Sequence, residues 1–155
     1  MIIRRAKDGD AKKLYDMLYT VQKLHADGRP DVFIEGTHKY GMAKILEILA
    51  CENTPVFVAE EDGEVAGYAF CEIIDSAGTQ NLRARKTYYI DDLCVEEKFR
   101  GKGVGKILYE HALKEAKKAG CDSLTLNVWH LNKNAVGFYE HLGMKPLKTT
   151  METLI

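Results

Sequence analysis

The apolar residues of this chain recur with a helical period in some segments and with a strand-like period in others. Apolar residues three and four positions apart predict helices at 8–24, 37–53, 104–119 and 134–142. Asp8 or Asp10 offers a cap for the first helix, and Thr37 offers one for the second. Alternating or β-rich runs predict strands at 1–6, 55–61, 64–75, 87–95, 123–129 and 144–155, the last interrupted near Pro146.

The order of these elements predicts an α/β fold built on one mixed sheet. Asp62-Gly63 lies between two β-rich runs and starts an antiparallel meander, because this dipeptide is a strong hairpin signal. The strand at 87–95, the helix at 104–119 and the strand at 123–129 predict one parallel pair. We therefore expect a mostly antiparallel α+β sheet flanked by helices. No linker or repeat divides the chain, so residues 1–155 are expected to form a single domain.

Composition excludes several classes of protein. A net charge of -1 argues against a nucleic-acid binder, which normally carries a large surplus of Lys and Arg. No apolar run has the length of a membrane span, and the N-terminal segment is too poor in apolar residues for a signal sequence. The cysteines have no CxxC pair and no His at zinc-ligand spacing, so reduced thiols, a cytoplasmic location and no metal site are expected.

A glycine-rich turn precedes the helix at 104–119 and is the first candidate for chemistry. Its glycines are Gly101, Gly103 and Gly105, and its basic residues are Arg100, Lys102 and Lys106. The entry of a helix leaves backbone N–H groups unpaired, and glycine lets an anion reach them. The turn matches neither the P-loop nor the dinucleotide-binding fingerprint. By itself it indicates either an anion site or a plain connection with a solvated basic fringe.

The turn does satisfy the pattern Arg-x-x-Gly-x-Gly, and there the chain resembles the GNAT N-acetyltransferase superfamily. The resemblance runs from the first strand to the last and has three anchors in order, "YYIDDLCV", "RGKGVG" and "NVWHLNKNAVGFYEHLGM". The third anchor carries Asn132, Tyr139 and Gly143 at the family's spacing, with Met144 in place of the usual Phe.

The resemblance implies the GNAT fold and acetyl-CoA as donor. In relatives the strand before the turn splays from its parallel neighbour at a bulge, and the gap receives the pantetheine arm. The backbone of Leu93, Cys94 and Val95 would then pair with the pantetheine, and one N–H would hold the thioester oxygen. The pyrophosphate would lie on Arg100, Gly101, Lys102, Gly103, Val104, Gly105 and Lys106. Asn132 would contact the pantetheine from the other side, and Tyr139 would face the thioester sulfur.

The strand motif "YIDDLCV" also suggests the base. In the similar spermidine and spermine N-acetyltransferases a Glu-Asp pair precedes the same turn, so Asp91 takes the place of a base or amine-binding Glu. Its shorter side chain favours a water relay. Neighbouring residues on a strand face opposite sides, so we expect only one of Asp91 and Asp92 to face the acceptor. The alternative is a pair of exposed aspartates in which Asp92 makes a structural hydrogen bond.

The resemblance implies an N-acetyltransferase that acts on a primary amine of a small molecule, polyamine-like or other, by direct attack in a ternary complex. Asp27, Glu72 and Asp92 are candidates for binding that amine, and His25, Arg29 and Asp31 lie in the same loop as Asp27. A protein lysine or N-terminal acetyltransferase stays open, as does a non-catalytic acyl-CoA-binding domain. The alternating final strand would be an exposed edge, which suggests a homodimer.

Overall fold

A computed structural model describes all 155 residues of the chain. Its single sheet has the strand order β1-β2-β3-β4-β5. The strands are β1 (Ile2–Arg5), β2 (Val56–Glu61), β3 (Glu64–Ser76), β4 (Arg85–Val95) and β5 (Ser123–Leu126). Every neighbouring pair is antiparallel except β4 with β5, which is parallel. The mixed and mostly antiparallel sheet is therefore confirmed.

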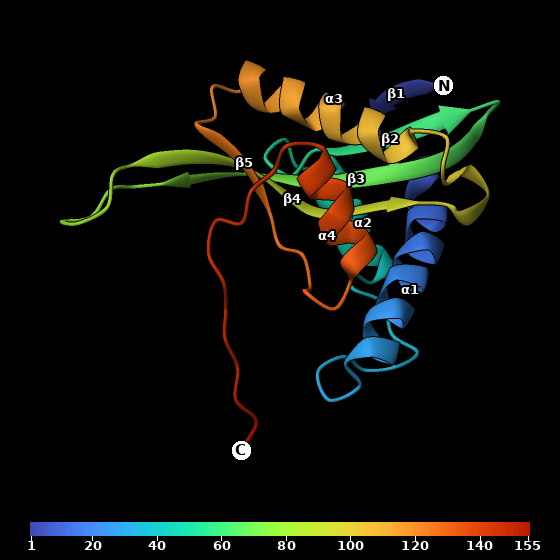
Figure 1. The fold of residues 1–155 in the computed structure, drawn as a ribbon. Helices are drawn as coiled ribbons and strands as arrows, with labels where there is room; N and C mark the ends of the chain where they lie inside the picture. The colour runs from blue at the N-terminus through green and yellow to red at the C-terminus, as the bar shows by residue number, and fades with distance from the viewer.

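Helices cover both faces of this sheet (Figure 1). They are α1 (Ala11–Gly28), α2 (Met42–Ala50), α3 (Val104–Lys118) and α4 (Lys133–His141), with short 3-10 turns η1 (Asp8–Asp10) and η2 (Glu97–Phe99). Alternation along β2 separates two cores: Val56 and Val58 pack with α1 and α2, whereas Phe57 and Ala59 pack with α3. Residues at the end of α4 pack against the second core.

Several predicted boundaries differ from the structure. The first helix continues to Gly28, and the second begins at Met42 behind Gly41. The Thr37 cap was wrong, because the Thr37 hydroxyl donates to Ile34 O (2.7 Å) inside the connecting loop. The strand predicted at 123–129 ends at Leu126.

The strand predicted at 144–155 is absent, and this segment runs away from the sheet as an extended tail (Figure 1). Its large apolar side chains are exposed, namely Leu147, Met151, Leu154 and Ile155. An alternating pattern makes a strand only when a neighbouring edge pairs with its backbone and covers its apolar side. Within one copy of this chain the tail has no such neighbour.

Two irregularities of β4 shape the region before the glycine turn. The register with β3 shifts so that Phe70 faces Asp92 and Cys71 faces Ile90, which leaves Asp91 as the extra residue of a β-bulge. The parallel pairing with β5 ends at Ile90 and Leu126. Residues 92–95 therefore pair with β3 alone, and no strand pairs with their other edge.

Candidate active site

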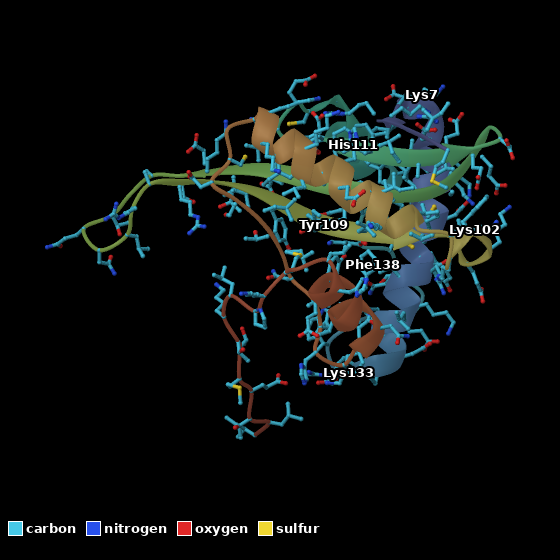
Figure 2. All side chains as sticks on the ribbon, turned by 45° about the horizontal axis from the view of Figure 1, so that its top comes forward. Lys7, Lys102, Tyr109, His111, Lys133 and Phe138 are labelled. Atoms are coloured by element: carbon cyan, nitrogen blue, oxygen red, sulfur yellow. The ribbon has the colours of Figure 1, made fainter.

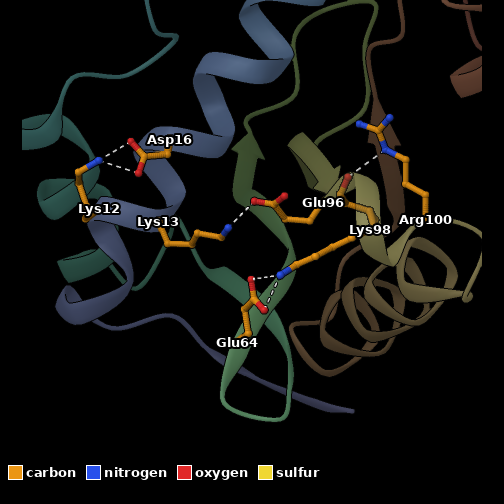
Figure 3. A network of polar contacts seen from close by, with 8 residues as sticks. Lys12, Lys13, Asp16, Glu64, Glu96, Lys98 and Arg100 are labelled. Carbon is orange, nitrogen blue, oxygen red and sulfur yellow. Dashed lines mark hydrogen bonds and ion pairs between the residues drawn. The ribbon is translucent and has the colours of Figure 1, made fainter.

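The free edge of β4 presents the backbone of two residues. Glu96 N–H donates to Ala66 O on the β3 side (2.9 Å), and hydrogen-bonding direction alternates along a strand. Cys94 therefore also faces β3, whereas Leu93 and Val95 face the gap. The carbonyl of Val95 accepts from Arg100 Nε (3.2 Å), as Figure 3 shows at the end of β4. Of the three residues predicted to pair with the pantetheine, Leu93 and Val95 present their backbone groups to the gap, and the pairing itself stays a prediction.

Glycine is required at the three positions of the turn for different physical reasons. Gly101 and Gly103 have φ of 74° and 80°, a left-handed backbone that side chains rarely adopt. A Cβ on either would meet no atom within 4 Å, so the space in front of them is open. A Cβ on Gly105 would lie 3.1 Å from Phe138 Cζ. Gly105 therefore permits the close packing of α3 on α4, and Figure 2 shows Phe138 beside the start of α3.

The backbone N–H groups of residues 101–106 have no acceptor in the protein. Gly103 is the residue before α3, and the first helical N–H to be bonded is that of Ile107, which donates to Gly103 O (3.1 Å). Consecutive free N–H groups at a helix N-terminus form an anion site. The donor set therefore fits a pyrophosphate.

The charges around the turn favour an anion as well. Two of the nearby acidic residues have their own partners, since Glu96 pairs with Lys13 and Glu64 with Lys98 (2.6 Å), as Figure 3 shows; Glu97 has none. Lys102 Nζ lies 5.1 Å from the ring centroid of Phe99, and Lys106 lies 3.8 Å from Glu110. Arg100 and Lys102 have no carboxylate partner, so positive charge remains at the mouth of the turn.

Asn132 and Tyr139 belong to α4, on the far side of the gap. The side chain of Asn132 accepts from Ala135 N–H (3.1 Å), which makes Asn132 the cap of α4. Tyr139 is partly buried against the α3 core, and its hydroxyl makes no hydrogen bond within the protein. Burial raises the pKa of Tyr139, and the negative charges of Asp92 and Cys94 raise it further. The phenol is therefore held neutral close to Asp92.

The bulge brings both aspartates to one lysine. Asp91 Oδ2 accepts from Tyr40 Oη (2.6 Å), and Asp91 Oδ1 lies 2.9 Å from Lys39 Nζ. Asp92 Oδ2 lies 3.9 Å from the same Nζ, and Asp92 Oδ1 accepts from Tyr68 Oη at 3.5 Å. Both carboxylates approach the same lysine because the bulge interrupts the alternation of the strand, and which of them faces the acceptor stays a prediction.

Asp92 is the more base-like of the two carboxyl groups. Its side chain is only 9% exposed. Burial raises the pKa of Asp92 to about 6; Lys39 opposes this change and Asp91 adds to it. A carboxyl group with a raised pKa at the edge of a gap is typical of a catalytic base. Sequence reasoning had placed the base at Asp91.

A hollow of about 230 Å³ lies beside Asp91, between α2 and the sheet. Glu72 lines it, as do Tyr40 and Glu47, so the structure places the predicted Glu72 in the same hollow as Asp91. Asp27 does not join them: it is exposed on α1 and paired with Lys23 (3.0 Å). Sequence reasoning missed Lys39 and Tyr40, which lie in an aperiodic segment with no motif.

The polar residues of the neighbouring loop pair with one another and with the tail, since Arg29 also lies 3.0 Å from Glu152. Arg29 makes a two-point ion pair with Asp31 (2.7 and 2.8 Å), and His25 stacks on Phe33. No group of His, Cys, Asp and Glu side chains is arranged to hold a metal ion. None of the helices combines the length and apolarity needed to cross a bilayer.

The model of the Acetyltransferase (GNAT) family matches residues 18–144. The chain belongs to the GNAT family. As a GNAT protein it is an acetyltransferase domain whose donor is acetyl-CoA. Its backbone follows a mutant of the BH1408 protein from Bacillus halodurans with a TM-score of 0.97 and 29% identity, over 100% of this chain and 99% of that one.

Two curated relatives of this GNAT chain extend the comparison. An uncharacterised N-acetyltransferase of Methanocaldococcus jannaschii is 35% identical over 87% of this chain. This chain spans only 65% of that relative's length. Thialysine N-epsilon-acetyltransferase of Sus scrofa is 27% identical over 95% of this chain and 85% of the relative.

Proposed function

We propose that the protein transfers the acetyl group of acetyl-CoA to a primary amine of a small cationic molecule, by direct attack in a ternary complex. The observation that carries this proposal is Asp92, a buried carboxyl group with a raised pKa beside the free edge of β4. Its side chain belongs to the α1 and α2 face, whereas Tyr139 approaches from α4. An amine and a thioester can therefore meet from opposite faces of the sheet.

The residues of the donor side have distinct roles in this proposal. Acetyl-CoA, when bound, supplies a thioester carbonyl and a thiolate leaving group. The N–H and C=O groups of Leu93 and Val95 pair with the pantetheine arm, and residues 100–106 bind the pyrophosphate. Asn132 contributes its free side-chain NH₂, because its oxygen is engaged as the helix cap.

Two groups stabilise the charge that develops during transfer. Leu93 N–H faces the gap next to Asp92 and is the oxyanion-hole donor in our proposal. Tyr139 donates its phenolic proton, or a hydrogen bond, to the departing sulfur. Its raised pKa keeps that proton in place at neutral pH. Because burial makes Tyr139 a weaker acid than the departing thiol, we assign Tyr139 the catalytic role of stabilising the thiolate through this hydrogen bond.

Asp92 takes the proton of the acceptor, and Asp91 holds the acceptor ammonium in place. Transfer from an ammonium of pKa about 10.4 to an ordinary Asp is uphill by about 6.5 units, or roughly 9 kcal/mol. With the Asp92 pKa near 6 the difference falls to about 4.4 units, or roughly 6 kcal/mol. Burial thus makes Asp92 the better proton acceptor by about 3 kcal/mol. This assignment moves the base from Asp91 to its neighbour.

The hollow beside Asp91 supports a small acceptor with a second cation. Glu72 lines it together with the aromatic ring of Tyr40 and makes no ion pair within the protein, so a second ammonium has a carboxylate to meet, whereas Glu47 is already paired with Lys44. The Sus scrofa relative is named as an acetyltransferase of thialysine, which also fits a small amine. The local resemblance to polyamine N-acetyltransferases supports the same class.

The test compares a diamine with the monoamine of the same chain length in wild type and Glu72→Gln. We expect the diamine to have the higher kcat/KM, and the variant to lose most of that preference with little effect on the monoamine. Intersecting initial-velocity lines are expected for a ternary complex. Equal kcat/KM values for the two amines would contradict the binding of a second cation in the hollow. Faster transfer to a lysine peptide would favour a protein substrate instead.

We also propose that residues 1–155 form a single cytoplasmic domain that pairs as a homodimer. The location is supported by four cysteines that form no disulfide. The dimer is supported by the exposed apolar residues of the tail and by β5, which is an edge strand. Sedimentation should give a dimer for the full chain and a monomer after removal of residues 147–155. A monomer in both cases would refute it.

A further inference from the structure

Lys39 lies in the segment between α1 and α2 and places its ammonium at the aspartate pair. Its Nζ is 2.9 Å from Asp91 Oδ1 and 2.9 Å from the main-chain oxygen of Asp91. Asp92 Oδ2 is 3.9 Å away, and the ring of Tyr40 lies 5.5 Å from the same Nζ. The Lys39 side chain is 35% exposed, so it is neither sealed in the core nor free in solvent.

This ammonium has the chemical nature of the proposed acceptor and lies where that acceptor must bind. Each of the other paired lysines contacts one carboxylate, either along its own helix, as Lys44 does with Glu47 (2.6 Å), or across the fold, as Lys98 does with Glu64 (2.6 Å). Lys39 instead reaches across the fold to two adjacent carboxylates, one of them the proposed base. An ion pair that only stabilises the fold requires one carboxylate. It does not require a second carboxylate that can act as a general base.

The point at which Lys39 contacts β4 is also consistent with acetyl transfer to its ammonium group. Asp91 lies one residue beyond the last pairing of β4 with β5, so its carbonyl has no partner on β5 and takes Lys39 Nζ instead. The free N–H of Leu93 lies two residues further along the same strand, roughly 7 Å away. The amine and the proposed oxyanion donor therefore lie at neighbouring points of one strand.

We propose that Lys39 is an acetylation site of the enzyme itself, modified in cis; this inference rests on the function proposed above. The ammonium gives a proton to Asp92, and the freed nitrogen lone pair forms a bond to the acetyl carbon. The bond from that carbon to sulfur breaks, and CoA leaves as a thiolate that takes up one proton. The products are Nε-acetyl-Lys39 and free CoA, with no further reactant.

Acetylation would change the segment that carries Lys39. The acetylated nitrogen is neutral, so Asp91 and Asp92 lose the cation between them. The loop from residue 29 to residue 41 then loses its ion pairs to β4, although Tyr40 can still donate to Asp91. The modified protein is therefore expected to hold this loop less firmly and to leave the aspartate pair open to a free amine.

The experiment incubates the full chain with acetyl-CoA and no added amine, and follows each lysine by peptide mass spectrometry. Lys44 serves as the matched reference for uncatalysed acetylation, since it lines the hollow beside Asp91 but pairs with Glu47 and with neither aspartate. We expect acetylation of Lys39 at least tenfold faster than that of Lys44, at a rate independent of protein concentration. Asp92→Asn should reduce the Lys39 rate to the Lys44 level.

A second readout needs no acetyl-CoA. Lys39→Gln, which resembles the acetylated side chain, should increase amide hydrogen exchange in residues 36–41 relative to wild type, whereas Lys39→Arg should not. An enzyme that acetylates a small amine while Lys39 is modified no faster than Lys44 would overturn this inference and leave the proposed function standing. Failure to acetylate both Lys39 and every amine would instead overturn the proposed function.

Discussion

Asp92→Asn should stabilise the protein, and more so as the pH rises. Burial raises the pKa of Asp92 from about 3.9 in the unfolded chain to about 6 in the native state. The native state therefore binds the proton more tightly, and its stability falls as the pH rises from about 4 to about 6. The full difference of about 2 units corresponds to roughly 3 kcal/mol at pH 8. Asparagine has a similar shape and carries no charge, so it avoids this cost.

The measurement is urea unfolding of wild type and Asp92→Asn at pH 5 and pH 8. At pH 5 about half of the cost is already present, so the advantage of the variant should grow by about 1.4 kcal/mol between the two values. The same variant should lose at least about a hundredfold in kcat/KM, in the range expected for loss of a general base. A stability difference that does not change with pH, or one that favours wild type more at pH 8, would refute the reasoning.

Asp10 is a second buried aspartate and serves as a control, because its pKa is lowered whereas that of Asp92 is raised. Arg4 holds the pKa of Asp10 below its usual range through hydrogen bonds of 2.7 and 2.9 Å. Asp10 therefore contributes stability above the unfolded pKa, and that contribution is lost as the pH falls through its native pKa. Asp10→Asn should destabilise the protein by the same amount at pH 5 and pH 8, because Asp10 is ionised in both states at these values.

The remaining predictions concern activity and the turn. The wild-type kcat/KM should rise with pH through about 6, because Asp92 must be ionised to accept a proton; a flat profile from pH 5 to pH 8 would contradict this. Tyr139→Phe should lower kcat with little change in the acetyl-CoA Kd, measured calorimetrically, and an unchanged kcat would remove its role. Gly103→Ala should weaken acetyl-CoA binding and reduce the free energy of unfolding by roughly 1 kcal/mol, because φ is positive there. Gly105→Ala should also lower the free energy of unfolding, but through crowding of the added methyl group against Phe138, and urea unfolding measures this loss.

The sequence predicted the donor side of this protein better than the acceptor side. Gly101 and Gly103 are required by local backbone conformation, so their positions in the chain already indicate an exposed helix entry. Gly105 shows the limit of that reasoning, since its small size serves a contact with Phe138 that is distant in sequence. The strand predicted at 144–155 is absent for a related reason. The alternation of apolar and polar residues does not show whether the edge of a neighbouring strand is available to pair with this segment.

The acceptor side depends on features that leave no periodic signal. The bulge at Asp91 comes from pairing with β3, and it places both aspartates beside Lys39. The pKa of Asp92 follows from burial by surrounding elements, which the two-residue motif does not contain. Lys39 itself lies in an irregular segment that reaches the site only in three dimensions. The proposal of Asp92 as the base therefore rests on tertiary contacts and not on local sequence pattern.

The central claim is that this chain acetylates a small primary amine, and one measurement tests it most directly. The purified protein is incubated with acetyl-CoA and a panel of diamines, amino acids, aminoglycosides and peptides, while released thiol and the acetylated product are both quantified. The account predicts thiol release that depends on a small cationic amine, saturates with it and yields one acetylated product per thiol. Release no faster than the amine-free rate for every amine, from a protein shown to bind acetyl-CoA, would contradict it.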